Sequence, residues 1–65
     1  MKIYELKPGS IVKITDEGVC TPPSSPQVET NDIVTLIKLN GMYCSAKNID
    51  GMLVYVAAWT EVEII

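Results

Sequence analysis

The chain has 65 residues, of which 48% are hydrophobic and 20% charged, and its eight acidic residues outnumber its five lysines to give a net charge of −3. This length allows one small domain over residues 1–65 and no second core, and the hydrophobic content excludes a disordered polypeptide. The sequence contains no Arg and no His. Because guanidinium groups are the usual readers of phosphate and guanine, we expect no preference for nucleic acid.

The N-terminal segment alternates apolar with polar residues, so it lacks the continuous apolar stretch of a signal peptide. No apolar run approaches the roughly 20 residues that a membrane-spanning helix needs. We therefore expect a cytoplasmic protein with no membrane partner. In that reducing compartment Cys20 and Cys44 are expected to be free thiols.

The first predicted strand follows a Pro8-Gly9 turn and runs from about Ser10 to Thr15. Its alternation places Val12 and Ile14 on one face, which is typical of a half-buried strand. The element is short, and residues 1–15 could bury no core alone. This strand must therefore pack against the rest of the chain.

The segment CTPPSSPQVETND, from Cys20 to Asp32, cannot form a strand or a helix, because its prolines remove backbone donors and favour an extended conformation. A long connection of this kind inside a compact domain is usually functional or mobile. We predict that the loop Asp16–Asn31 is mobile at its Pro-rich centre. We also predict that it forms a binding rim rather than a passive connection, with Asp16 and Glu17 as acidic contact residues.

Two dipeptides, Asn40-Gly41 and Asp50-Gly51, predict tight hairpins in the second half of the chain. Each lies between β-rich runs and tolerates the positive φ that both central residues of a type I′ turn require. They divide this region into three antiparallel strands, Asp32–Leu39, Met42–Ile49 and Met52–Ala57. In the middle strand, the period of two places three residues on the core face: Met42, Cys44 and Ala46.

The C-terminal TEVEII also alternates and predicts a last strand, with Val62 and Ile64 inward and Glu61 and Glu63 outward. The preceding AAWTE is too short for a helix and is predicted to form one tight turn. The sequence therefore predicts an all-β fold with five strands.

The predicted order of elements resembles the Src-homology-3-like small barrel superfamily over about Pro8 to Ile65. The segment MYCSAK is similar to the third strand of that family, with Tyr43 at the place of its ligand-contacting Trp and Ala46 at its small core position. The segment GMLVYVAAWTEVE is similar to the passage through a short helical turn into the last strand. The resemblance implies a five-stranded barrel with a long loop after the first strand and a short helical turn before the last strand.

The resemblance does not extend to the binding of Pro-rich peptides. The tyrosine-rich segment that opens the peptide-binding members is absent from IYELKPGSIVKI, and Ala57 stands where they usually have a groove-forming Pro. The same small barrel also supports many unrelated functions. A function for this chain must come from its own surface residues.

Catalysis and metal binding are not expected. Without His, general-base chemistry would fall to carboxylates or Lys, and neither thiol has a neighbouring base that would activate it. Two distant Cys without His match no zinc-ligand spacing. The lysines are scattered along the sequence and are predicted to be solvated surface residues. We therefore expect neither an enzyme nor a cofactor.

The aromatic residues point to protein binding. Tyr43 and Tyr55 are predicted to face outward and Trp59 to lie on an exposed turn, and Tyr and Trp dominate binding hot spots. Trp59 has an alternative role, in which it folds down to cap the open end of the barrel. We predict a binding module or small inhibitor, such as an accessory protein of a phage, that contacts a protein partner through these aromatics and the acidic loop.

A second hypothesis is a homo-oligomer that binds a small ligand, such as a nucleotide, between its subunits. A small barrel gains stability by association, and the apolar EVEII strand could present an edge to a neighbouring subunit.

Overall fold

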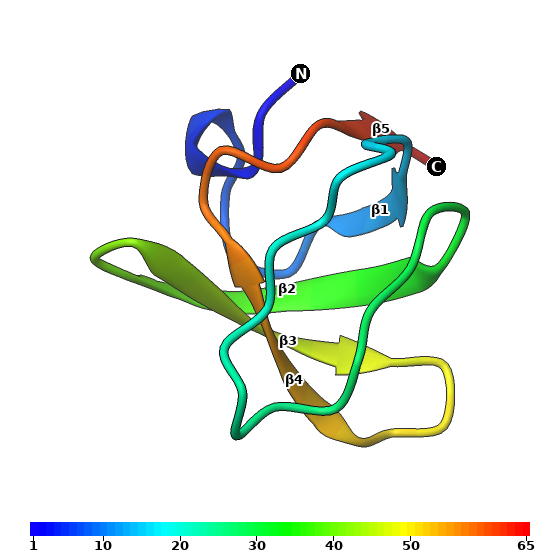
Figure 1. Cartoon of the computed structure of the whole chain (residues 1–65). Helices are drawn as coiled ribbons and strands as arrows, with labels where there is room; N and C mark the ends of the chain where they lie inside the picture. The colour runs from blue at the N-terminus through cyan, green and yellow to red at the C-terminus, as the bar shows by residue number, and fades with distance from the viewer.

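The structure is a computed structural model that describes residues 1–65. Five strands and one turn of 3-10 helix make up the fold (Figure 1). In chain order they are η1 (Ile3–Glu5), β1 (Ile11–Ile14), β2 (Ile33–Asn40), β3 (Tyr43–Asn48), β4 (Leu53–Ala57) and β5 (Val62–Ile64). The predictions of an all-β fold and of five strands are confirmed. The fold contains no helix with the length and apolar character needed to cross a membrane.

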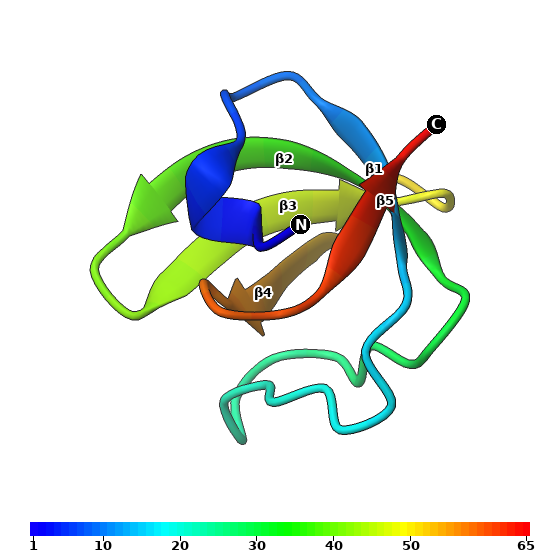
Figure 2. The same ribbon diagram turned by 90° about the horizontal axis from the view of Figure 1, so that it is seen from above.

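The strands form one antiparallel sheet in the order β4-β3-β2-β1-β5. Its two edge strands, β4 and β5, do not pair with each other, so the sheet does not close into the predicted five-stranded barrel. The long loop runs beside β4 instead, and the N-terminal segment runs beside β5 (Figure 2). Both edges of the sheet are therefore covered by segments that are not strands.

Backbone hydrogen bonds hold these two covering segments in place. The Val62 N–H donates to the Met1 carbonyl at 2.8 Å, next to an isolated bridge between Lys2 and Glu61. On the other edge, the Ala57 N–H donates to the Cys20 carbonyl at 3.0 Å. These bonds give partners to edge N–H groups that would otherwise face solvent or a neighbouring molecule.

The N-terminal turn η1 was not predicted from the sequence. Glu5 stabilises its start, because the Glu5 carboxylate accepts a hydrogen bond from the Lys2 N–H at 2.9 Å. The turn inserts Ile3, which is only 2% exposed, into the core. The predicted helical turn before the last strand is instead a single hydrogen-bonded turn, in which the Thr60 N–H donates to the Ala57 carbonyl at 3.0 Å.

The core collects residues from every strand, from η1 and from the long loop: Ile3, Val12, Ile14, Val28, Val34, Leu36, Cys44, Ala46, Val54, Val56 and Val62. The predicted inward positions on β1, on β5 at Val62, and on β3 at Cys44 and Ala46 are confirmed. Ile64 was also predicted to face inward but is 58% exposed. The N-terminal segment reaches β5 only as far as Val62, so no backbone hydrogen bond from that segment reaches Ile64.

The β2–β3 hairpin differs from its prediction by one residue. Asn40 pairs with Tyr43 at the end of the strands, so the two loop residues are Gly41 and Met42 rather than Asn40 and Gly41. Gly41 has a φ of +61°, whereas Asn40 keeps a negative φ. A positive φ at the first loop residue alone is typical of a type II′ turn. As a result Met42 lies in the turn, 64% exposed, and not on the predicted core face.

The loop of the β3–β4 hairpin is longer than predicted. The Gly51 N–H donates to the Asn48 carbonyl at 3.0 Å, and the Asn48 N–H donates to the Met52 carbonyl at the same distance. Within this loop, only Gly51 has a positive φ, of +81°. This arrangement is a three-residue loop closed by a glycine, which replaces the predicted type I′ turn.

The long loop is more structured than its composition predicts. Val28 is 2% exposed within the core, and Val19 packs against the same cluster. The Thr30 hydroxyl donates to the Asp16 carbonyl at 2.6 Å and ties the two arms of the loop together. The loop therefore closes the side of the core that the open sheet leaves uncovered.

If the loop completes the core, Val28→Ala will lower the free energy of unfolding by about 2 kcal/mol, because it removes two buried methyl groups and leaves a cavity. Gln27→Ala, at the exposed neighbouring position, is the matched control and will change it by less than about 0.5 kcal/mol. Urea unfolding measures both values. Equal, small effects at the two positions would show that the loop contributes nothing to the core.

Candidate functional site

The two predicted tyrosines lie on the outer face of the sheet, away from the core. Tyr43 pairs with Ala57 and Tyr55 pairs with Ser45, so the two tyrosines occupy diagonal positions on neighbouring strands β3 and β4. Both are half-buried. The sheet therefore brings these two predicted residues together.

Trp59 lies on the turn between β4 and β5, with 43% of its surface exposed. The residues on either side of it, Ala58 and Thr60, are the ones that are buried. Small residues therefore fill this end of the core. Trp59 itself lies partly at the surface, beside this end of the core.

Two backbone hydrogen bonds gather further exposed apolar residues around Trp59. The Tyr4 N–H donates to the Ala58 carbonyl at 3.0 Å, and the Ala58 N–H donates to the Met42 carbonyl at 2.8 Å. These bonds join η1, the β2–β3 turn and the β4–β5 turn at one end of the sheet (Figures 1 and 2). Tyr4 is 56% exposed there, and Met42 64%.

Leu39 adds a fourth exposed apolar residue, and a β-bulge in β2 determines its position. The bulge falls between Leu36 and Lys38, so Leu36 pairs with Ala46 but Leu39 pairs with Cys44. The extra residue turns Leu39 toward the core side and Lys38 to the outer face. We call the exposed residues at this end of the sheet the apolar end: Tyr4, Leu39, Met42 and Trp59.

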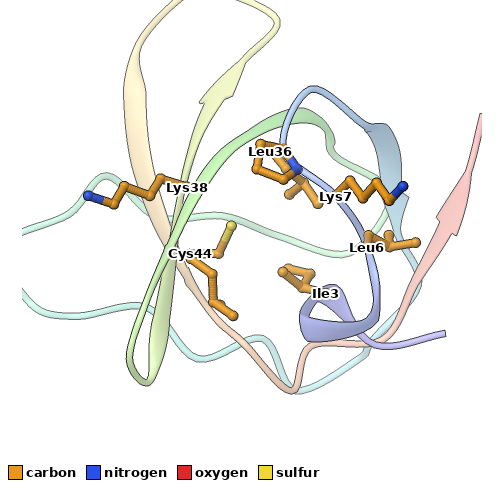
Figure 3. Close-up of a pocket in the computed structure, with 8 residues that line it drawn as sticks. Ile3, Leu6, Lys7, Leu36, Lys38 and Cys44 are labelled. Atoms are coloured by element: carbon orange, nitrogen blue, oxygen red, sulfur yellow. The ribbon is translucent and has the colours of Figure 1, made fainter.

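A small hollow of about 20 Å³ opens beside Leu39. Its floor is formed by the buried side chains of Ile3, Leu36 and Cys44, which converge in Figure 3, whereas the Lys38 side chain extends away from them. This space holds one water molecule or a methyl group. It is far smaller than the roughly 300 Å³ at which small-molecule sites begin.

The thiol at the floor of this hollow is not activated. Burial raises the pKa of Cys44, against a smaller opposing effect of the backbone N–H groups of Lys38 and Ile37. A raised pKa keeps the thiol protonated at neutral pH, and the thiolate is the nucleophilic form. Cys20 is also unpaired and lies at the surface.

The outer face of β2, β3 and β4 combines the tyrosines with two lysines. Lys38 pairs with Ser45, and Lys47 pairs with both Thr35 and Leu53. Asn40 lies on the same face, and its side-chain amide donates to the Ser45 hydroxyl at 2.9 Å. We call this surface the tyrosine face: Lys38, Asn40, Tyr43, Ser45, Lys47 and Tyr55. The lysines are scattered along the sequence, but strand register brings two of them, Lys38 and Lys47, onto one face.

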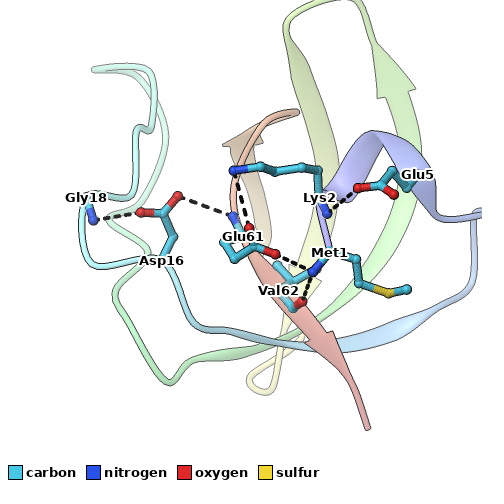
Figure 4. Close-up of polar contacts among 7 residues, drawn as sticks. All are labelled: Met1, Lys2, Glu5, Asp16, Gly18, Glu61 and Val62. Atoms are coloured by element: carbon cyan, nitrogen blue, oxygen red, sulfur yellow. Dashed lines mark hydrogen bonds and ion pairs between the residues drawn. The ribbon is translucent and has the colours of Figure 1, made fainter.

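Asp16, a predicted contact residue, is hydrogen-bonded within the protein. Its carboxylate accepts hydrogen bonds from the Gly18 N–H at 2.9 Å and from the Glu61 N–H at 3.2 Å (Figure 4). These two backbone donors, Gly18 first, lower the pKa of Asp16 despite an opposing effect of desolvation. Asp16 thereby fastens the start of the long loop to the residue before β5.

Glu61 continues this polar network. Its carboxylate contacts the Met1 ammonium group and lies 3.3 Å from the Lys2 ammonium nitrogen, and these two cations, Met1 first, lower the pKa of Glu61 (Figure 4). The Met1 ammonium also donates to the Val62 carbonyl at 3.1 Å. The network joins the N-terminal segment, the long loop and β5.

Glu17, the other predicted acidic contact, is exposed. It lines a shallow groove of about 200 Å³ between the two arms of the long loop, together with Glu29. A second groove, of about 220 Å³, contains Asp32 and Asp50, and no lysine lines either groove. No group of three or more Cys, Asp or Glu residues is arranged to hold a metal ion.

Three of the four residues of the apolar end were not predicted from the sequence. Tyr4 precedes the first predicted strand, Met42 was assigned to the core, and Leu39 takes its orientation from a bulge that period-two alternation does not show. Their only signal in the sequence was apolar side chains beside turn residues.

No protein-family model, curated protein or solved structure matches the chain. The resemblance to the Src-homology-3-like superfamily therefore stays a prediction.

The Asp16 network predicts a loss of stability in acid. A carboxyl group whose folded-state pKa is lowered contributes stability above its unfolded pKa, about 4 for Asp, and loses that contribution as the pH falls through the folded value. We expect Asp16→Asn to lower the melting temperature at pH 7 and to show a smaller further decrease between pH 5 and pH 2.5 than the unchanged protein shows. Thermal melts across this range measure both effects.

Glu17→Gln removes the same charge from the adjacent exposed position and is the control. It should leave the pH dependence unchanged. Identical pH profiles for the two variants would mean that Asp16 does not fasten the loop.

Proposed function

We propose that the protein is a non-enzymatic binding module that occupies the surface of a protein partner through its apolar end. One observation carries this proposal: four large apolar residues that are 43–64% exposed lie on segments that backbone hydrogen bonds and strand pairing bring to one end of so small a domain. Exposed apolar patches mark interaction sites, because burying them against a partner removes apolar surface from water. Trp, Tyr and Met are also enriched in interfaces.

The state of the nucleophilic and acidic groups supports a role without catalysis. The Cys44 thiol has a raised pKa within the core. The Asp16 carboxylate is engaged by two backbone N–H groups. Neither group is arranged as an activated nucleophile or a general base.

We further propose that the fold is an opened form of the Src-homology-3-like small barrel. The order of its elements supports this: a long loop after β1, two hairpins that connect β2, β3 and β4, and one turn before β5. Tyr43, which the resemblance places at the position of a ligand-contacting Trp, is part of the tyrosine face.

The apolar end can be tested with two serine substitutions. Immobilised protein is expected to capture a stoichiometric protein partner from an extract of its source cells. Trp59→Ser should weaken the affinity for that purified partner by roughly thirtyfold, as expected for the loss of a hot-spot aromatic. Ile49→Ser, at an 81% exposed residue in the β3–β4 turn at the other end of the sheet, should leave the affinity unchanged.

Circular dichroism spectra of both variants establish that they fold. If no partner is captured, or if the two variants bind it equally well, the apolar end is not the binding surface and this function is wrong.

A second candidate function, association of identical copies, is favoured by a different surface. Ile65, directly after the edge strand β5, is 66% exposed, and Ile11 on β1, whose carbonyl accepts a hydrogen bond from the Ile65 N–H at 3.1 Å, is 50% exposed. The two larger grooves, of about 200 and 220 Å³, are smaller than ordinary ligand sites, so a small ligand would need a site between subunits. Native mass spectrometry separates the two functions: a monomer without a retained ligand excludes the second.

A further inference from the structure

The tyrosine face adjoins the apolar end, because Tyr43 directly follows Met42. Its two lysines lie on neighbouring strands, opposite positions that are two residues apart along β3. With the ordinary spacing of strands and residues, the Lys38 and Lys47 backbones are about 8 Å apart. Both side chains are therefore able to contact one short segment of a partner.

These two lysines carry charge that nothing in the chain neutralises. The two ion pairs of the protein involve only the Met1 ammonium, Lys2 and Glu61. The outer positions of β2, β3 and β4 contain no Asp or Glu. Four carboxylates line two grooves instead, one between the arms of the long loop and one at the β3–β4 turn: Glu17, Glu29, Asp32 and Asp50. A chain of net charge −3 thus has one locally positive face beside its apolar end.

We propose that the tyrosine face selects an acidic partner segment in which carboxylates alternate with aliphatic side chains. The inference rests on the proposed function, since it names the chemistry of the partner that the apolar end would bind. The carboxylates meet the Lys38 and Lys47 ammonium groups, and the aliphatic groups pack against Tyr43, Tyr55 and the apolar end. Asn40 donates one N–H to Ser45, so its carbonyl and second N–H can bond the backbone of the segment.

The charge distribution favours an acidic peptide over a nucleic acid. Nucleic-acid affinity depends on many cationic contacts to consecutive phosphates. The tyrosine face offers two lysines and the chain has no Arg, while the acidic grooves repel a long polyanion. A peptide with two suitably placed carboxylates needs no more cations than this face provides.

Three synthetic peptides test the inference: one that alternates glutamate with leucine, and two in which glutamine or lysine replaces every glutamate. Fluorescence anisotropy with the labelled peptides measures affinity for the purified protein. The glutamate peptide should bind at least roughly tenfold tighter than the glutamine peptide, and added salt should reduce this difference. The lysine peptide should bind most weakly. Amide chemical shifts should change at Tyr43, Tyr55 and Trp59.

The double variant Lys38→Gln, Lys47→Gln should bind the glutamate peptide only as well as the unchanged protein binds the glutamine peptide. The matched control, Lys2→Gln, Lys13→Gln, removes the same charge from the N-terminal segment and from β1, where these lysines lie opposite Glu61 and Glu63, and should retain full affinity. Equal loss in both double variants would assign the effect to net charge and overturn the inference.

Other outcomes also overturn it. If the three peptides bind equally, or none binds, the face does not select acidic segments. If a single-stranded oligonucleotide binds through Lys38 and Lys47 while the glutamate peptide does not, the face is a nucleic-acid site. The proposed binding module is tested separately. If the unchanged protein still captures a protein partner and Trp59→Ser does not, the binding module stands even though the selection of acidic segments has failed.

Discussion

The edges of an open sheet impose the constraint on which this structure depends. Five strands that do not close leave donors and acceptors unpaired along β4 and β5, and such edges invite aggregation. Here the long loop covers β4 through Cys20 and Ser25, and the N-terminal segment covers β5 through Met1. The same two segments contribute Val28 and Ile3 to the core. Irregular segments therefore complete both the hydrogen bonding and the packing of the domain.

This solution also determines which surfaces are free for binding. The hydrogen bond from Tyr4 to Ala58 that docks η1 also brings an exposed tyrosine beside Trp59. Within the long loop, Asp16 and Val28 bind within the protein, whereas Glu17 and Glu29 are exposed. The outer sheet face and the apolar end have no such internal role, so they are the surfaces from which we infer function.

Local patterns predicted much of the fold. Alternation located the first and last strands, and two turn dipeptides, with their need for positive φ at Gly41 and Gly51, located the three between them. What the patterns missed depends on interactions between distant residues. The bulge after Leu36 reverses the facing of Lys38 and Leu39, and period two alone would have placed Lys38 inward. Asn40 pairs with Tyr43 instead of entering the turn, which exposes Met42. The tyrosine pair was predictable, but its lysines and the apolar end were not.

Amide hydrogen exchange tests the covering of the β4 edge most directly. The Tyr55 N–H donates to the Ser25 hydroxyl and the Ala57 N–H to the Cys20 carbonyl, each at 3.0 Å, although β4 is an edge strand. Both amides should exchange as slowly as those between paired strands. Ser25→Ala should speed exchange at Tyr55 by roughly tenfold, through loss of one hydrogen bond, and leave Ala57 unchanged. Rapid exchange of both amides in the unchanged protein would contradict the account, because the loop would then not complete the sheet.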